Sequence, residues 1–254
     1  LQNSLMLSAD VTAAFDPNYP GVCEKKNTAY HEAGHATVSW HLQYANPLIK
    51  VTIVPRGKAL GAAWYLPEER QITTREQMMD ELAATLAGRV SEQIFFGHLS
   101  TGALNDLERV TKQVYAMVAY YGMSPKVGNI SFYDSSGQRD MFTKPFSERT
   151  AELIDDEVRR LVDESVATTR RIIEEERENI ERLADLLIEK ETIFTEDIEA
   201  ILGRSAQQIE RDKREEAEKA KKAEKSEDSG REPSPEPTIT YIVEPSVEEP
   251  TKEN

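Results

Sequence analysis

The stretch Thr28-Ala-Tyr-His-Glu-Ala-Gly-His-Ala-Thr-Val-Ser-Trp-His-Leu42 decides how the rest of the chain is interpreted. It contains His31 and His35 four positions apart, with Glu32 beside the first. On a helix, residues i and i+4 lie on the same face one turn apart, so two imidazoles can bind one ion. Catalytic zinc accepts such ligands and keeps one position for water. The spacing therefore predicts a zinc peptidase in which Glu32 is the general base.

The alternative is a helix that carries two histidines and a surface glutamate without binding any ligand. The residues around the two histidines argue against it, because most of them are apolar: Tyr30, Ala33, Ala36, Thr37, Val38 and Trp40. A pair of histidines buried among such neighbours needs a partner. A metal ion is the partner that the spacing indicates.

The composition excludes several classes of protein. The 254-residue chain has a formal net charge of −15 and a sequence pI near 4.8, so it would repel phosphate, and we expect no nucleic-acid partner. A single cysteine, Cys23, argues against a disulfide framework and fits a reducing compartment. No apolar run approaches the roughly 20 residues that span a bilayer. Because the first residue is Leu1 rather than Met, we expect a fragment of a longer protein.

The residue pattern divides the chain into three parts and predicts an α+β, mainly α fold. Residues 1–23 lack sustained periodicity and are expected to be a linker or the remnant of a preceding domain. Residues 24–204 are expected to form a zinc-peptidase helical domain with a small β-sheet, followed by a C-terminal helical bundle. Residues 205–254 are charged and Pro-rich, and are expected to be a disordered acidic tail.

Hydrophobic periodicity and capping residues place the elements of the domain. We expect helices over 24–42, 73–97 and 103–120, several helices between 147 and 202, and strands over 48–54, 60–66 and 130–133. Thr73 and Glu76 would form a capping box. The first two strands would form a hairpin, whose second strand carries the small residues Gly61, Ala62 and Ala63. That strand is either one arm of a simple hairpin or a substrate-binding edge that takes an extended peptide.

Zinc needs a third protein ligand, and three residues are candidates. His41 has the spacing of the extended pattern His-Glu-x-x-His-x-x-Gly-x-x-His, but Val38 stands where that pattern needs Gly. A continued helix carries His41 about 120° round the axis from His35 and roughly 9 Å along it, so His41 is rejected. Glu92 on the following helix and Asp106 at the start of the next remain, and the residues alone leave both open.

Five motifs follow one another along the chain: Thr-Ala-Tyr-His-Glu-Ala-Gly-His, Lys-Val-Thr-Ile-Val-Pro-Arg-Gly, Leu-Ala-Gly-Arg-Val-Ser-Glu, Ser-Thr-Gly-Ala-Leu-Asn-Asp and Leu-Leu-Ile-Glu-Lys-Glu. Together they resemble the peptidase domain of the FtsH family. Members of this family are membrane-anchored, ATP-dependent zinc metalloproteases of bacteria, mitochondria and chloroplasts. The resemblance covers about residues 24–202 and is far more specific than the five-residue His-Glu-x-x-His motif.

The resemblance implies the roles of the site residues. The zinc ligands would be His31, His35 and Asp106. Glu32 would be the catalytic residue, and Glu92 would have an outer-shell or structural role. The resemblance also implies a homo-oligomer in the form of a hexameric ring.

The residues and the resemblance together predict a zinc-dependent endopeptidase that hydrolyses unfolded or membrane-extracted polypeptides. ATP would enter only through an ATPase module, because this chain has no Gly-x-x-x-x-Gly-Lys-Ser/Thr loop. Membrane association would likewise come through segments absent here, with the peptidase domain facing the bacterial cytoplasm or the mitochondrial matrix or another organelle interior. Two rival functions remain: a stand-alone metallopeptidase for small peptides, and a catalytically inactive scaffold of the same fold.

Overall fold

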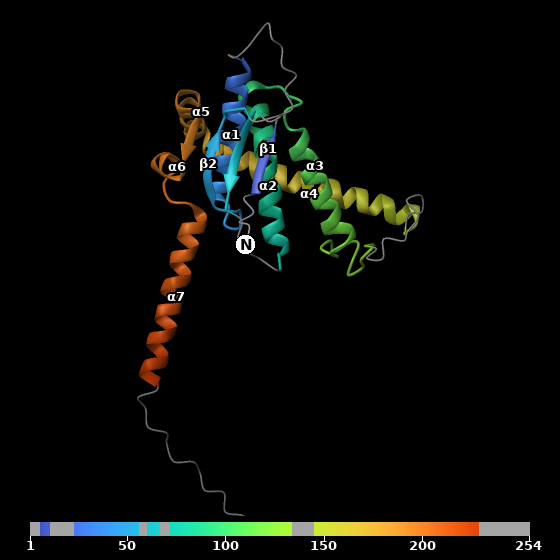
Figure 1. The fold of residues 1–254 in the computed structure, drawn as a ribbon. Helices are drawn as coiled ribbons and strands as arrows, with labels where there is room; N and C mark the ends of the chain where they lie inside the picture. The colour runs from blue at the N-terminus through green and yellow to red at the C-terminus, as the bar shows by residue number, and fades with distance from the viewer. Residues whose placement is uncertain (1–5, 11–22, 56–59, 67–71, 134–144, 229–254) are drawn as a thin grey trace, which may run out of the picture. The chain divides into compact units, whose positions relative to one another are not determined.

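The computed structural model of the chain describes residues 6–10, 23–55, 60–66, 72–133 and 145–228. The chain divides into two units, Leu1–Asp212 and Lys213–Asn254. The elements in chain order are β1 (Met6–Asp10), α1 (Cys23–His41), β2 (Leu48–Thr52), β3 (Gly61–Tyr65), α2 (Arg75–Phe96), α3 (Leu104–Ala119), α4 (Glu148–Glu175), α5 (Arg177–Lys190), β4 (Thr192–Phe194), α6 (Thr195–Leu202) and α7 (Ala206–Asp228) (Figure 1). The predicted α+β, mainly α fold is confirmed.

Helix α1 is the centre of the first unit, because every residue from Thr28 to Trp40 is buried. Helices α2 and α5 pack against it, and β2 and β3 cover a further side (Figure 1). Gly34 allows α2 to approach closely, since a Cβ at this position would lie 2.7 Å from the Cβ of Ser91. The Ser91 hydroxyl also donates a hydrogen bond of 2.7 Å to the Tyr30 carbonyl. These contacts set the crossing of the two helices that build the site.

The strands form one antiparallel sheet in the order β1-β3-β2-β4. Strands β2 and β3 form the predicted hairpin. Strand β1 lies in the segment that was expected to be a linker or the remnant of a preceding domain. Residues 6–10 pair with β3 from Met6 opposite Tyr65 to Asp10 opposite Gly61. Strand β4 was also not expected. It pairs with β2 and is held there by a hydrogen bond of 2.8 Å between the hydroxyls of Thr52 and Thr192.

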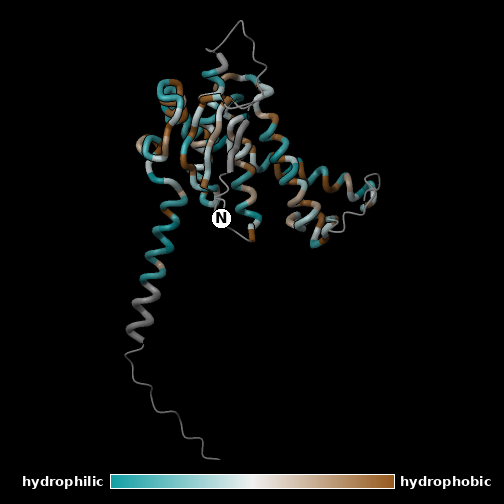
Figure 2. The backbone as a smooth tube through the Cα atoms, in the orientation of Figure 1, coloured by the Kyte–Doolittle hydropathy of each residue, from teal (hydrophilic) through white to brown (hydrophobic). Residues whose placement is uncertain are grey.

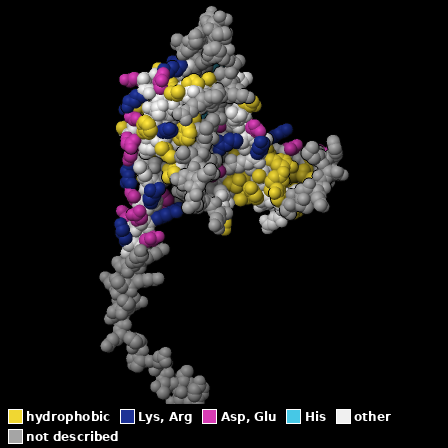
Figure 3. Space-filling model, in the orientation of Figure 1, with side chains coloured by type: hydrophobic (Ala, Val, Ile, Leu, Met, Phe, Trp, Pro, Cys, Tyr) yellow, Lys and Arg dark blue, Asp and Glu magenta, His cyan; other side chains and the backbone are white. Residues whose placement is uncertain are grey.

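The expected strand over 130–133 is wrong, because this segment has no regular secondary structure. Its apolar side chains instead contact the end of α3. The Phe132 amide donates to the Ala119 carbonyl, and the rings of Tyr120 and Tyr133 meet edge to face at 5.4 Å. Hydrophobic side chains gather on the surface over the α3 and α4 region in Figure 3. Exposed residues in this part of the chain include Tyr121, Ile130 and Tyr133.

Two of the predicted helix starts can be compared with the structure. Helix α2 begins with a capping box formed by Thr74 and Gln77, one residue later than the expected pair Thr73 and Glu76. Helix α4 begins at the predicted cap, Ser147. The C-terminal helices follow as predicted, and they are amphipathic, with hydrophobic and hydrophilic residues alternating along the tube in Figure 2. Helix α4 packs mainly on α2 and α3, and α5 packs mainly on α1.

A buried ion-pair cluster attaches the segment after α3 to α4. The Glu157 side chain is fully buried and contacts Lys126 at 2.8 Å and Arg160 at 3.1 Å, while the Ser124 hydroxyl donates to it at 2.8 Å. Hydrogen bonding from Arg160 is the largest influence, and together with Lys126 and Ser124 it lowers the pKa of Glu157 to about 2. The cluster keeps the C-terminal end of α3 in place on α4.

The segment from residue 205 was expected to be a disordered tail with some charged helix at its start, and the structure has helix α7 over Ala206–Asp228. The physical reason is composition, since this segment is rich in Ala, Glu, Lys and Arg, which are strong helix formers. The side-chain amide of Gln207 also donates to the carbonyls of Ser39 and Leu42, at 2.8 and 2.6 Å. The remainder of the expected tail, 229–254, lies outside the described residues. Among the described residues, no helix is long and apolar enough to cross a membrane.

Candidate metal centre

Helix α1 places the two predicted histidine ligands together. The rings of His31 and His35 have centroids 4.8 Å apart, and their Nε2 atoms lie 3.1 Å apart. Both side chains are buried, although imidazole is polar. The spacing of four residues on a continuous helix produces this arrangement, as the sequence predicted.

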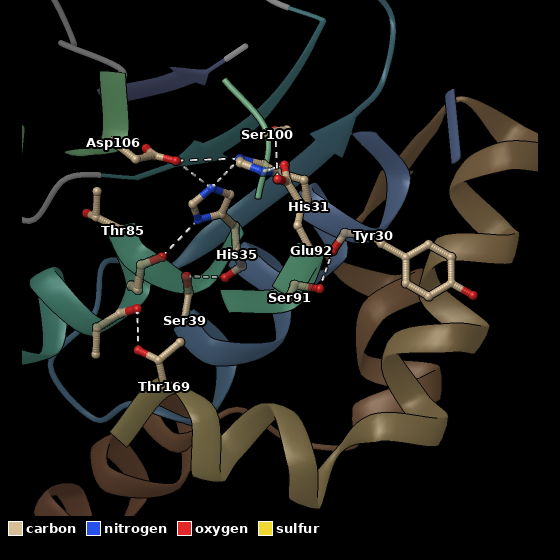
Figure 4. Close-up of polar contacts among 12 residues, drawn as sticks. Tyr30, His31, His35, Ser39, Thr85, Ser91, Glu92, Ser100, Asp106 and Thr169 are labelled. Atoms are coloured by element: carbon tan, nitrogen blue, oxygen red, sulfur yellow. Dashed lines mark hydrogen bonds and ion pairs between the residues drawn. The ribbon is translucent and has the colours of Figure 1, made fainter. Parts of the chain in front are cut away.

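Helix α3 brings the third residue to the same point. Asp106 lies in the first turn of α3, and its Oδ2 atom is 3.1 Å from His35 Nε2 and 3.5 Å from His31 Nε2 (Figure 4). One ligand atom from each of these three buried residues lies within 4.8 Å of the others. The structure therefore brings together the three residues that the resemblance implied as ligands.

The Nδ1 atoms of the two histidines donate hydrogen bonds to acceptors on α2. His31 Nδ1 donates to Glu92 Oε1 at 2.8 Å, and His35 Nδ1 donates to the Ala84 carbonyl at 2.8 Å. Glu92 Oε2 in turn accepts a hydrogen bond of 2.7 Å from the Ser100 hydroxyl (Figure 4). Burial raises the pKa of the Glu92 carboxyl, but the hydrogen bond and charge of His31 together with the hydrogen bonds from Ser100 outweigh burial and lower this pKa. Glu92 thus contacts a candidate ligand on the side away from Asp106, which is the geometry of an outer-shell partner.

The donor set fits a zinc ion. A carbonyl and a carboxylate can only accept, so each Nδ1 carries a proton, and each Nε2 lies near Asp106, where it can bind a metal ion once it has lost its own proton. The Nε2 atoms of His31 and His35 and the carboxylate of Asp106 meet at one buried point, and these electron-rich groups need a positive charge between them. Burial lowers the pKa of His31, but the carboxylates of Asp106 and Glu92 outweigh it and raise the pKa to about 10. Two nitrogens and one carboxylate oxygen form a common donor set of catalytic zinc.

Two glycines make room for this centre. A Cβ at Gly61 would lie 2.5 Å from Glu32 Oε1, and a Cβ at Gly88 would overlap the imidazole of His31. Glu32 itself is buried. Sequence reasoning did not identify the role of Gly88 or of Ser100. Gly88 could have been found, because glycine in a helix interior is unfavourable and often has a packing reason.

His41, which the sequence analysis rejected as a ligand, makes its contacts elsewhere. Its Nδ1 atom donates to the Thr37 carbonyl at 2.9 Å, and its Nε2 atom is 3.3 Å from Glu176. Both contacts are on the side of α1 that faces the C-terminal helices.

The predicted substrate-binding residues Gly61, Ala62 and Ala63 lie on β3, beside the centre. They were expected on an edge strand, but in the structure β3 is an inner strand between β1 and β2. The edge is occupied because residues 6–10 of the same chain pair with it. Strand β1 also packs near α3, the helix that carries Asp106.

Comparison with known proteins agrees with this geometry. The family model described as peptidase family M41 matches residues 22–201, which is more than half of the chain. The chain belongs to peptidase family M41.

Relatives within the M41 family are close in sequence. The chain is 61% identical over 183 residues to the ATP-dependent zinc metalloprotease FtsH of Parabacteroides distasonis, an alignment that covers 72% of this chain and 27% of that protein. It is 52% identical over 183 residues to the protein of the same name in Rhodothermus marinus, covering 71% and 26%. It is 50% identical over 181 residues to the mouse mitochondrial inner membrane m-AAA protease component AFG3L2, covering 71% and 22%. The FtsH-family resemblance is confirmed, and the chain spans about a quarter of the length of these M41 relatives.

Proposed function

We propose that this chain is the zinc-dependent endopeptidase part of an ATP-dependent protease. The observation that carries the proposal is the meeting of His31 Nε2, His35 Nε2 and Asp106 Oδ2 at one buried point, with Glu32 beside it on α1. These three residues would hold the ion. When bound, zinc polarises the substrate carbonyl and makes the attacking water more acidic.

Glu32 is the general base of the proposed reaction. It follows a candidate ligand directly in the sequence, so its carboxylate lies beside the ion without being needed as a ligand. The carboxylate takes a proton from the attacking water and delivers it to the nitrogen of the leaving amine. Gly61 leaves space for this carboxylate next to β3, where the peptide would lie.

The substrate would bind as an extended strand along β3, at Gly61, Ala62 and Ala63. The pairing of β1 with this strand supports the proposal, because it is an example of an extended segment on this edge with antiparallel hydrogen bonding. Binding through main-chain atoms depends little on side chains, which suits a protease with broad specificity. Strand β1 would have to leave before a substrate takes the same edge.

Unfolded or membrane-extracted polypeptides are the proposed substrates, and the parent protein would be a membrane-associated homo-oligomer in the form of a hexameric ring. The names of the relatives support the ATP dependence and, for AFG3L2, the membrane location. ATP would act through an ATPase module outside this sequence, and the peptidase would face the bacterial cytoplasm or an organelle interior. The exposed apolar residues Tyr121, Ile130 and Tyr133 suit burial against another subunit.

The experiment that tests the proposal compares wild type with Glu32→Gln. Zinc content should be one ion per chain in both, because Glu32 is not a ligand, whereas hydrolysis of casein, an unfolded protein, should fall by roughly 10³-fold or more in the variant. Glu108→Gln, at an exposed position on α3, is the matched control and should retain activity. A zinc-loaded Glu32→Gln protein with near wild-type turnover would refute the mechanism.

The same assay separates the rival functions. A wild-type protein that cleaves short peptides but not casein would indicate a stand-alone peptidase for small substrates. A wild-type protein that binds zinc and cleaves neither would indicate an inactive scaffold. Glu32 argues against the scaffold, because a zinc site retained only for structure has no need of a general base.

A further inference from the structure

A cavity opens beside the metal centre, at the end of β3 away from Gly61. His35 forms part of its wall, together with Ser39, Tyr65, Glu81 and Arg109. It is therefore in direct contact with one of the candidate ligands. A side chain of a peptide lying along β3 can enter this cavity while the peptide backbone stays on the strand.

Arg109 is the cationic residue in the wall of this cavity. It lies three residues after Asp106 on α3, so both side chains are on one face of the helix. Arg109 is half-buried, and its guanidinium has no hydrogen bond or ion pair with any residue that the structure describes. A guanidinium carries five donors and is always charged, so a partner from a ligand would be favourable.

The electrostatics of Tyr65 show that Arg109 acts on the same site. Burial raises the pKa of the Tyr65 hydroxyl, the hydrogen bond from Ser39 opposes this, and the carboxylates of Glu32 and Asp106 raise it further. Arg109 lowers the pKa of the same group. The charge of Arg109 therefore reaches Tyr65, which lines the same cavity.

Glu81 brings a negative charge to the same cavity but is already engaged. Its Oε2 atom accepts a hydrogen bond of 2.9 Å from the Gln113 side chain, one helical turn beyond Arg109 on α3. The positive charge of Arg109 is thus available to a ligand, whereas the carboxylate of Glu81 is partly satisfied. An acidic substrate side chain would accept hydrogen bonds from Arg109. Glu81 would repel it less than a carboxylate without a hydrogen-bond partner would.

The direction of β1 indicates which substrate residue enters the cavity. In the antiparallel register, Met6 at the start of β1 lies opposite Tyr65, and Asp10 at its end lies opposite Gly61, next to Glu32. A substrate that runs in the same direction places residues N-terminal to its scissile bond at the Tyr65 end. The cavity would therefore take a side chain on the N-terminal side of the bond that is cut.

We propose that Arg109 is a specificity-determining residue that favours polypeptides with Asp or Glu on the N-terminal side of the scissile bond. This inference rests on the proposed peptidase function and adds to it a preference within otherwise broad specificity. Arg109 binds the substrate carboxylate and takes no part in the bond-breaking step.

The test uses the zinc-loaded 254-residue chain and fluorogenic peptides that differ only in Glu, Gln or Lys at one position, scanned over both sides of the cleaved bond. For wild type, kcat/KM should be about tenfold higher for Glu than for Gln at the position that enters the cavity. Arg109→Gln should bring this ratio close to one, mainly by lowering kcat/KM for the Glu peptide. Arg109→Glu should reverse the preference in favour of Lys.

Two further variants serve as controls. Lys112→Gln removes an exposed cation on the same helix, which is paired with Glu108, and should leave the ratio unchanged. Glu81→Gln removes the opposing charge and should increase the preference for Glu. Raising the ionic strength should reduce the wild-type preference for the Glu peptide, because Arg109 is only half-buried and salt would screen its attraction to the substrate carboxylate.

The outcomes distinguish this inference from the proposed function. Cleavage of all peptides without a charge preference, or the same preference in wild type and Arg109→Gln, overturns the role of Arg109 and leaves the peptidase intact. Failure of the zinc-loaded wild type to cleave any peptide overturns the peptidase function, and the role of Arg109 with it.

Discussion

Substitution of Gly61 by Ala tests whether the position of the Glu32 carboxylate controls catalysis. The new Cβ would lie 2.5 Å from Glu32 Oε1, 2.8 Å from Glu32 Cγ and 2.9 Å from Thr28 Cγ2. Gly61 is not among the glycines with positive φ, so alanine can adopt its backbone conformation, and the effect comes from the side chain. An ordinary contact begins near 3.4 Å, so the carboxylate must move by about 0.9 Å, the difference between 3.4 and 2.5 Å.

A displacement of this size is large for a general base. A misplacement of about 1 Å costs roughly 10²-fold in rate, so kcat should fall by about 10²-fold in Gly61→Ala. Crowding in a buried site should lower the free energy of unfolding by about 1–3 kcal/mol. Zinc binding should be retained, because the three atoms nearest to the added methyl group belong to Glu32 and Thr28 and not to a candidate ligand.

The assay measures zinc content, casein cleavage and thermal unfolding on the same preparations. Gly88→Ala is the matched comparison, because its methyl group would overlap the His31 ring and should abolish stoichiometric zinc binding instead. The reasoning is refuted if Gly61→Ala is folded, binds zinc and has the wild-type kcat. It is also refuted if the two variants lose zinc equally.

Three further predictions follow from the geometry. Asp106→Ala should weaken zinc binding by at least 100-fold in a metal-competition titration, whereas His41→Ala should leave it unchanged, and equal effects would contradict the ligand assignment. Zinc binding near pH 8 should release a proton, because the pKa of His31 is raised to about 10 without metal and zinc needs the neutral ring. Calorimetry in buffers of different ionisation enthalpy would detect this proton. The affinity for zinc should therefore rise with pH below that pKa, and an affinity that does not change with pH would exclude a bound proton. Removal of residues 1–22 should lower KM for casein several-fold by freeing the β3 edge, and an unchanged KM would show that β1 does not compete with substrate.

The candidate metal centre was largely predictable because two of its three candidate ligands lie on one helix. The spacing of His31 and His35 on one helix places two donors together without any knowledge of the tertiary structure. Asp106 is separated from His35 by 71 residues, and only the family resemblance distinguished it from Glu92. Packing of α3 against α2 and α4 brings Asp106 to the two histidines, and no local pattern reports such packing.

The errors in the predicted elements have similar physical causes. Strand β1 was missed because its partner, β3, is distant in sequence, and pairing rather than propensity makes residues 6–10 a strand. The residues of segment 130–133 favour a strand, but the Tyr133 ring contacts Tyr120 at the end of α3, and the Phe132 ring contacts Phe146. Adjacent Thr73 and Thr74 each have a suitable residue three positions later, so the sequence does not decide between two capping boxes.

The hydrogen bonds of Glu92 have a consequence for the protein without its ion. Glu92 on α2 contacts His31 on α1 through one oxygen and Ser100, just before α3, through the other. A metal ion held by His35 and Asp106 would close a chain loop across the same three helices. The ion would then stabilise the packing of these helices in addition to its proposed role in catalysis. Chelation should loosen the start of α3 as well as abolish the proposed activity, so that the metal-free protein would be easier to degrade.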